Sequence, residues 1–137
     1  MITFAAFSRV VSGADIANSV TINTACSSSL YALEIACKAL SSGECGSAVV
    51  GGSNLILTVD QHMNTAKLGV LSPTNQSRPF DESANGYGRA EGVGAIYLKP
   101  LSAAIRDGSP IRALIRSTAS SRFVQLVIMD SIYRTDY

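Results

Sequence analysis

The spacing of apolar residues along the chain changes near residue 25 from alternation to a period of three and four. Residues 19–24, SVTINT, carry β-branched side chains at alternate positions and predict a short strand. From Ser27 the helical period takes over and Gly43 supplies a stop, which predicts a helix of about four turns whose start is capped by serines. Residues 46–57, GSAVVGGSNLIL, then predict a buried strand. Strand, helix and strand in this order are typical of a parallel βαβ unit.

The second half of the chain alternates polar loops with shorter elements. Residues 59–73 predict a partly helical connection, and residues 74–92 are too rich in Gly, Asn and Pro for a helix or strand. Residues 93–100 predict a strand, residues 101–108 a short helix, and residues 110–119 a strand of alternating pattern. The order of elements predicts the α/β class.

Composition narrows the class of protein further. The 137 residues suffice for one domain, and a content of 47% hydrophobic and 15% charged residues is typical of a folded chain with a buried sheet. A net charge of +1 provides no field to attract nucleic acid or an anionic membrane, and no apolar run is long enough to span a bilayer. Three cysteines without a CxxC pair or a signal-like N-terminus predict a reducing, cytoplasmic location.

Cys26 lies where the first predicted strand meets the helix. A residue at such a turn faces solvent near the unpaired N–H groups of the first helical turn, which favour an anion and so the reactive thiolate. Its neighbours Ala25, Ser27 and Ser28 are small and leave room for an acyl group. These features indicate a nucleophile, although a cysteine that only packs remains an alternative. Two further cysteines, Cys37 on the apolar face and Cys45 after the helix, are interpreted as structural.

The stretch TINTACSSSLYALEIACKALSSGECGSAVVGGSNLIL resembles the active-site region of β-ketoacyl synthases, and LGVLSPTNQSRPFDESANGYGRAEGVGAIYLKPLSAAIRDGSPIRALIRSTA continues the resemblance in order and spacing. The similarity covers residues 19–119 and is strongest to the ketosynthase domains of fungal iterative type I polyketide synthases. It implies an α/β, partial thiolase-like fold with βαβ units and a mixed sheet, limited to the N-terminal half of the domain. Residues 1–18 match poorly and residues 120–137 are unmatched.

The resemblance also implies a reaction. Cys26 would accept an acyl chain from an acyl carrier protein and condense it with a malonyl thioester by a decarboxylative Claisen reaction, in polyketide or fatty-acid biosynthesis. The phosphopantetheine cofactor belongs to the carrier protein, so none is expected to bind this chain directly. The parent enzyme is expected to be a homodimer. Two histidines downstream of the cysteine assist condensation in this family, and we expect this fragment not to condense without them.

Three positions raise questions about this assignment. The single histidine, His62, matches no catalytic block of the family and is interpreted as a surface residue, and no ligand spacing predicts a metal site. The family usually has Asp in place of Asn23 and Gly in place of Ala90. If Ala90 had to adopt a positive φ, its Cβ would cost about 1 kcal/mol or more.

Two alternative functions remain open at the level of sequence. The chain could be a non-catalytic remnant or interaction module that pairs through its sheet, since residues 19–24 lie at the dimer interface in the family. A cysteine hydrolase would need His62 as its base. Residues 120–137 are interpreted as out-of-frame or unspliced translation or a gene-model error, and the uncharged segment Phe123–Met129 would be prone to aggregate if exposed.

Overall fold

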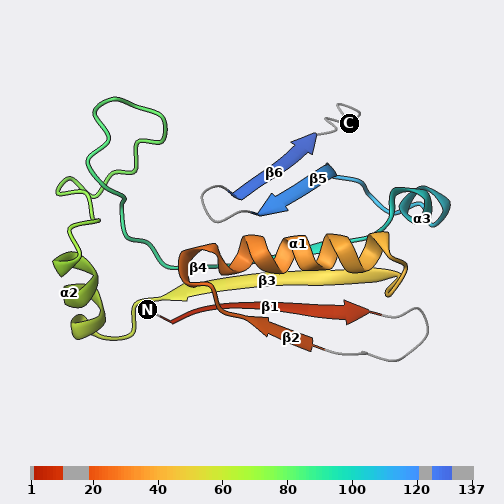
Figure 1. Cartoon of the computed structure of the whole chain (residues 1–137), viewed down its shortest axis with the longest axis horizontal. Coiled ribbons are helices and arrows are strands. Elements are labelled where there is room, and N and C mark those ends of the chain that lie inside the picture. Colours follow the sequence, from red (N-terminus) through yellow and green to blue (C-terminus); the bar gives the residue numbers. More distant parts are fainter. Residues whose placement is uncertain (1, 11–18, 121–124, 131–137) are drawn as a thin grey trace.

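The chain is built around one long helix that lies on a four-stranded sheet (Figure 1). The computed structural model describes residues 2–10, 19–120 and 125–130. In chain order, the elements are β1 (Ile2–Val10), β2 (Ser19–Ile22), the 3₁₀ turn η1 (Ala25–Ser27), α1 (Ser28–Ser41), β3 (Ser47–Leu55), α2 (Val59–Lys67), β4 (Gly92–Leu98), α3 (Leu101–Arg106), β5 (Leu114–Ser120) and β6 (Gln125–Asp130). The α/β class predicted from the sequence is confirmed.

The strands of the main sheet follow the order β2-β1-β3-β4, and each neighbouring pair is antiparallel. Strands β2 and β3 therefore run in the same direction, as a βαβ unit requires, but β1 lies between them. The sequence predicts a mixed sheet with parallel strands, whereas all neighbouring strands of this sheet are antiparallel. The reason is that β1 pairs along the whole of β3, from Ile2 opposite Leu55 to Val10 opposite Ser47. This pairing occupies the edge of β3 that a directly adjacent parallel strand would use.

Helix α1 has the extent that its apolar period predicts. An ion pair of 2.7 Å joins Glu34 and Lys38 one turn apart, in the orientation that stabilises a helix. At the C-terminus Gly43 adopts φ +75°, and its N–H donates to Leu40 O while the next N–H donates to Ala39 O. This pair of bonds is a Schellman motif, so the predicted glycine stop is confirmed.

The core lies between α1 and the sheet. Its buried members are small for the most part, namely Ala32, Leu33, Ala36, Ala39, Cys45, Ala48 and Val50. Alanines on the inner face of α1 let the helix approach the strands closely. Figure 1 shows the β5–β6 pair on the opposite side of α1 from the sheet, and α1 contacts β5 as well as β1 and β3. The helix is therefore the middle layer of the molecule.

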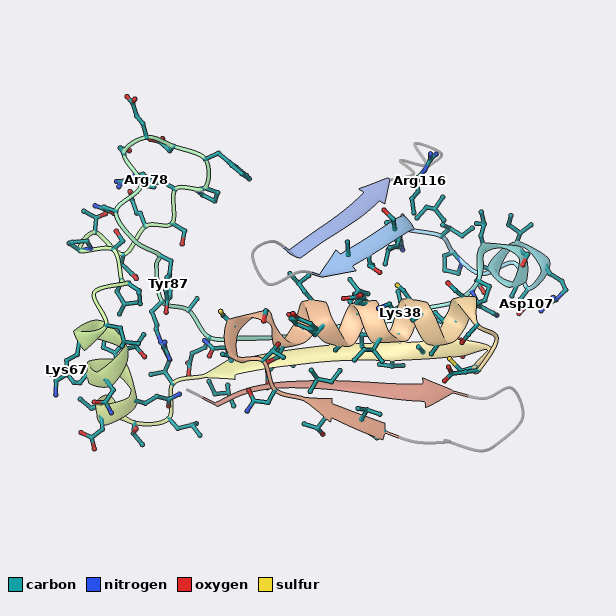
Figure 2. The ribbon with its side chains drawn as sticks, in the orientation of Figure 1. Lys38, Lys67, Arg78, Tyr87, Asp107 and Arg116 are labelled. Atoms are coloured by element: carbon teal, nitrogen blue, oxygen red, sulfur yellow. The ribbon has the colours of Figure 1, made fainter. Side chains whose placement is uncertain are left out.

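Helix α2 and the polar loop after it extend away from these layers (Figure 1). Thr58 caps α2 by accepting the N–H of Gln61 at 3.2 Å, and the Gln61 side chain accepts the N–H of Leu57 in return. The loop holds no helix or strand, as its composition predicts. Its two ends are joined where Ser72 N–H donates to Tyr87 O and Tyr87 N–H donates to Val70 O, at 3.0 and 3.1 Å. In Figure 2 Tyr87 lies at the base of the loop, and Arg78 lies farther out.

The C-terminal part of the described chain forms a second, two-stranded sheet. β6 pairs antiparallel with β5, so most of the segment that would aggregate if exposed has a partner strand. Residues 121–124 and 131–137 lie outside the described residues, so the interpretation of residues 120–137 as mistranslated stays a hypothesis, as do the boundaries at 18 and 119. None of the described helices combines the length and apolarity needed to cross a bilayer.

Candidate active site

The structure places Cys26 at the junction between β2 and α1. Two residues separate the end of β2 from η1, and α1 begins directly after η1. Cys26 is the middle residue of this 3₁₀ turn, and its side chain is exposed. The dipole of a 14-residue helix favours negative charge at this end, and the first turn of α1 contains no acidic residue to oppose it. Cys26 therefore lies between a strand and a helix, as the sequence predicts.

The backbone turns sharply one residue before the thiol. Ala25 adopts φ +56°, in the left-handed region that costs a residue with a Cβ about 1–2 kcal/mol. Its N–H donates to Oδ1 of Asn23 at 3.2 Å. An Asp at this position would accept the same bond, so the amide of Asn23 fills the role of the residue that the family usually has. The turn formed by residues 23–28, called the elbow below, is therefore compatible with Asn in place of the usual Asp.

The serines after Cys26 support the turn in an unexpected way. Ser27 Oγ donates to Thr24 O at 2.8 Å and lies 2.9 Å from Thr24 Oγ1. Ser28 Oγ donates to Ala25 O at 2.7 Å and accepts the N–H of Thr24 at 2.8 Å. The expected serine cap is thus wrong for Ser27, the N-cap of α1, because its hydroxyl makes no capping bond to the helix. Both hydroxyls bond back to the turn instead.

The amide of Cys26 is available for another acceptor. No hydrogen bond from this N–H is found within the described part of the chain. A backbone N–H beside a nucleophile can donate to the oxygen that becomes negatively charged when a thioester carbonyl is attacked. The elbow therefore brings an exposed thiol and an available backbone donor together in one residue.

A depression of about 330 Å³ lies next to the first turn of α1. It is lined by residues from α1, β3 and β4, namely Ser29, Gly52, Ser53, Asn54, Gly92 and Gly94. A Cβ added at Gly92 or Gly94 would meet no atom within 4 Å. The wall formed by β4 is therefore free of side chains at these two glycines, and the space lies one helical turn from Cys26 in sequence.

Two long-range hydrogen bonds fix the loop beside this depression. Asn54 Nδ2 donates to Ala90 O at 2.5 Å, and Ile56 N–H donates to Glu91 Oε1 at 2.6 Å. Ala90 is not among the residues with positive φ, so the strain expected for alanine at this position is absent. Left-handed φ occurs instead at Asn75 and Phe80 in the same loop, in addition to Ala25.

His62 lies on α2 and is exposed, in agreement with its interpretation as a surface residue. It lines a separate depression of about 320 Å³ with Ile56, Leu57, Thr58 and Val59. No hydrogen bond joins His62 to Cys26 in the described part of the chain. The arrangement gives no support to His62 as a base for Cys26.

The other cysteines have packing positions. Cys45 belongs to the buried core, and Cys37 packs against that core and is half-buried. Burial, followed by the negative charge of Glu34, raises the pKa of the Cys37 thiol. A raised pKa lowers the thiolate fraction, so Cys37 is a poorer nucleophile than an ordinary thiol. No cluster of metal-binding side chains occurs among the described residues.

Residues 16–104 match the family model for the β-ketoacyl synthase N-terminal domain, so the chain belongs to the β-ketoacyl synthase family. It is 71% identical over 103 residues to the reducing polyketide synthase DEP5 of Fusarium langsethiae, covering 75% of this chain and 4% of that protein. It is 59% identical over 101 residues to the highly reducing polyketide synthase rstn3 of Aspergillus nomiae, covering 74% and 4%. The resemblance to fungal polyketide synthases is confirmed.

Solved structures agree with the sequence relatives. The ketosynthase from module 6 of the bacillaene synthase of Bacillus subtilis 168 is 42% identical, with a TM-score of 0.67 over 71% of this chain and 18% of that chain. The expected partial thiolase-like α/β fold is therefore confirmed as a ketosynthase fold. The chain spans only a small fraction of the length of each of these proteins.

Proposed function

We propose that Cys26 is the nucleophile of a ketosynthase domain and accepts an acyl chain from a thioester. The observation that carries the proposal is the exposed thiol at the elbow, whose own N–H has no acceptor in the described part of the chain. The match of residues 16–104 to the family supports it. The glycine-lined depression beside Ser29 lies at the same end of α1 as Cys26, three residues after it in the chain.

The transfer step uses the thiol and the N–H of Cys26, together with water that takes up and returns a proton. Cys26 gives its thiol proton to water, and the resulting thiolate attacks the carbonyl carbon of the donor thioester, whose oxygen takes up the negative charge. The Cys26 N–H donates to this oxygen and stabilises it. The bond to the donor sulfur then breaks, the leaving thiolate takes a proton from water, and the acyl group remains on Cys26.

In the parent synthase we propose that the donor is an acyl carrier protein with its phosphopantetheine arm. A malonyl thioester then loses CO₂, and its carbanion attacks the acyl carbonyl, forms the new carbon–carbon bond and releases the thiolate of Cys26. The parent would act as a homodimer in the cytoplasm, with no cofactor held by this chain itself. The reducing polyketide synthases among its relatives support this assignment.

For this chain alone we propose acylation without condensation. The sequence contains one histidine, His62, whereas condensation in the family uses two. Without groups that polarise the malonyl carbonyl, decarboxylation has no stabilised intermediate. Incubation with malonyl thioester should therefore release no CO₂ above the background of a Cys26→Ala control.

Mass spectrometry tests the assignment of the nucleophile. The chain is incubated with hexanoyl-CoA, digested, and the acylated peptides are mapped. Hexanoyl should appear on Cys26 and be absent from the Cys26→Ala variant, with Cys37 and Cys45 as internal controls. Modification confined to Cys37 or Cys45 would contradict the proposal.

A second function, that of an interaction module without catalysis, is supported by the position of β2. This strand lies at an edge of the sheet, and its first three residues are exposed. An edge strand offers unpaired N–H and C=O groups to a partner strand. Co-purification with an intact fungal synthase, together with no acylation of Cys26, would favour this function over the first.

A further inference from the structure

We propose that Ser28 is a positioning residue that aims the amide of Cys26 at the acyl carbonyl. The inference rests on the proposed acyl transfer at Cys26 and goes beyond it, because Ser28 acts through the backbone and needs no contact with the substrate. Ser28 is completely buried, with 0% of its surface exposed. Its hydroxyl makes two short hydrogen bonds, and both go to the backbone of the elbow.

The first step of the argument concerns the peptide unit between Ala25 and Cys26. Its carbonyl oxygen accepts both the Oγ–H of Ser28, at 2.7 Å, and the N–H of Ser28. A trans peptide is planar, so its C=O and N–H point in opposite directions. Fixing the Ala25 carbonyl toward the helix therefore fixes the Cys26 N–H in the opposite direction, away from Ser28.

The second step concerns the two peptide units that precede the Ala25–Cys26 unit. Ser28 Oγ also accepts the N–H of Thr24 at 2.8 Å. In the peptide unit between Thr24 and Ala25, both polar groups are hydrogen-bonded. The Ala25 N–H donates to Asn23 Oδ1, and the Thr24 oxygen accepts from Ser27. Ala25 lies between two peptide planes whose orientations are fixed, which imposes its φ of +56°.

The third step concerns strain. A left-handed alanine persists only when its surroundings hold it there, and such residues often occur at functional sites. The Ser28 hydroxyl is the one side-chain group found to bond on both sides of Ala25 within the described residues. Removing it should let Ala25 relax and let the Cys26 N–H turn away from the substrate.

The experiment compares two reactions of the same thiol. Transfer from hexanoyl-CoA passes through an oxyanion and needs the aimed N–H, whereas alkylation by iodoacetamide displaces iodide and forms no oxyanion. Both second-order rates are measured at Cys26 by peptide mapping of the full 137-residue chain. In Ser28→Ala the acylation rate should fall about 100-fold, the loss typical of a misplaced reacting group or a lost oxyanion donor. Alkylation should change by less than about threefold.

Rescue separates positioning from general stability. Glycine adopts positive φ without a steric cost, so Ala25→Gly combined with Ser28→Ala should recover about tenfold in acylation over Ser28→Ala alone. Ser28→Thr keeps the hydroxyl and should retain the ratio of the two rates. The matched control is Ser42→Ala, because Ser42 Oγ also donates to a carbonyl three residues earlier, at the far end of α1. It should leave both rates unchanged.

Each outcome decides the proposal. A folded Ser28→Ala variant with the wild-type ratio of rates, or a glycine variant that restores nothing, would overturn it. If circular dichroism shows Ser28→Ala unfolded, the same ratio is compared between Ala25→Gly and the double variant. If wild-type Cys26 is alkylated but never acylated, the proposed function fails. The hydrogen bond from the Thr24 N–H to Ser28 Oγ is then tested by hydrogen exchange, because the Thr24 amide should exchange faster in Ser28→Ala.

Discussion

Replacing Gly86 with alanine should separate the two segments that are hydrogen-bonded at the base of the polar loop. Gly86 adopts φ +130°, a conformation that residues with a side chain rarely adopt. A Cβ there would lie 2.5 Å from Ser72 N, 2.6 Å from Leu71 C and 2.8 Å from Val70 O. These contacts are with backbone, so no flexible side chain can move aside. The two segments that meet at the base of the loop must separate.

The expected loss of stability in Gly86→Ala is the sum of the backbone strain and the broken hydrogen bonds. Strain at this φ costs about 1–3 kcal/mol. Separation also breaks the two backbone bonds between the segments, Ser72 N–H to Tyr87 O and Tyr87 N–H to Val70 O, each worth about 0.5–1.5 kcal/mol. Together these effects amount to about 2–6 kcal/mol, a large share of the roughly 5–15 kcal/mol by which domains are stable.

The measurement combines urea denaturation with native-state hydrogen exchange. Gly86→Ala should lower the free energy of unfolding and remove protection at the amides of Ser72 and Tyr87. The matched control is Gly94→Ala, because its Cβ would meet no atom within 4 Å and its φ is not left-handed. The control should change stability by less than about 1 kcal/mol.

One result would refute this reasoning. If Gly86→Ala keeps both amides protected and unfolds at the same urea concentration as Gly94→Ala, the loop base cannot be packed as described. Loss of protection without a change in global stability would instead show that the loop opens as an independent unit, which the local character of the two bonds allows.

Further predictions concern charge, the elbow and thiol reactivity. The hydrogen bond with Lys99 lowers the pKa of Asp107 from its ordinary value of 3.8. The pair therefore stabilises the fold above that value, and acid titration of the melting temperature should show less loss below pH 3.8 in Lys99→Met than in wild type. Asn23→Ala should lower the unfolding free energy by about 0.5–1 kcal/mol in urea denaturation, because an acceptor in the elbow is lost. Iodoacetamide should label Cys45 about tenfold or more slowly than Cys26, as read by mass spectrometry, since Cys45 is buried.

Helix α1 and the strands on either side of it could be predicted because their signals are local. The apolar period from Leu30 to Leu40 and the stop at Gly43 depend only on nearby residues, and the structure reproduces both. The same holds for the position of Cys26 between strand and helix. Its role as nucleophile stays a proposal.

The arrangement of the sheet could not be predicted from the same patterns. Insertion of β1 between β2 and β3 depends on pairing between segments some 45 residues apart, from Ile2 opposite Leu55 to Val10 opposite Ser47. No periodicity within a segment encodes its partner. The sequence therefore predicted β2, β3, β4 and β5, but it did not predict β1 or β6, and the order of the strands had to come from the structure.

The details of the elbow were also missed, for a different physical reason. The run of serines predicted caps, but a hydroxyl can accept an N–H or donate to a carbonyl, and residue type does not distinguish the two. Ser27 and Ser28 donate back to the turn, and the left-handed residue is Ala25 rather than a glycine. A strained alanine flanked by hydroxyl residues is a pattern that could point to such a turn in other sequences.

The elbow is held almost entirely by its own residues. Each of its side-chain hydrogen bonds joins positions two to four apart, all between Asn23 and Ser28. Interactions of such low contact order close quickly and need little help from distant parts of a chain. The geometry around the sulfur can therefore form early in synthesis, before distant segments of the chain emerge, and a hexapeptide of this kind can be grafted between a strand and a helix of an unrelated scaffold.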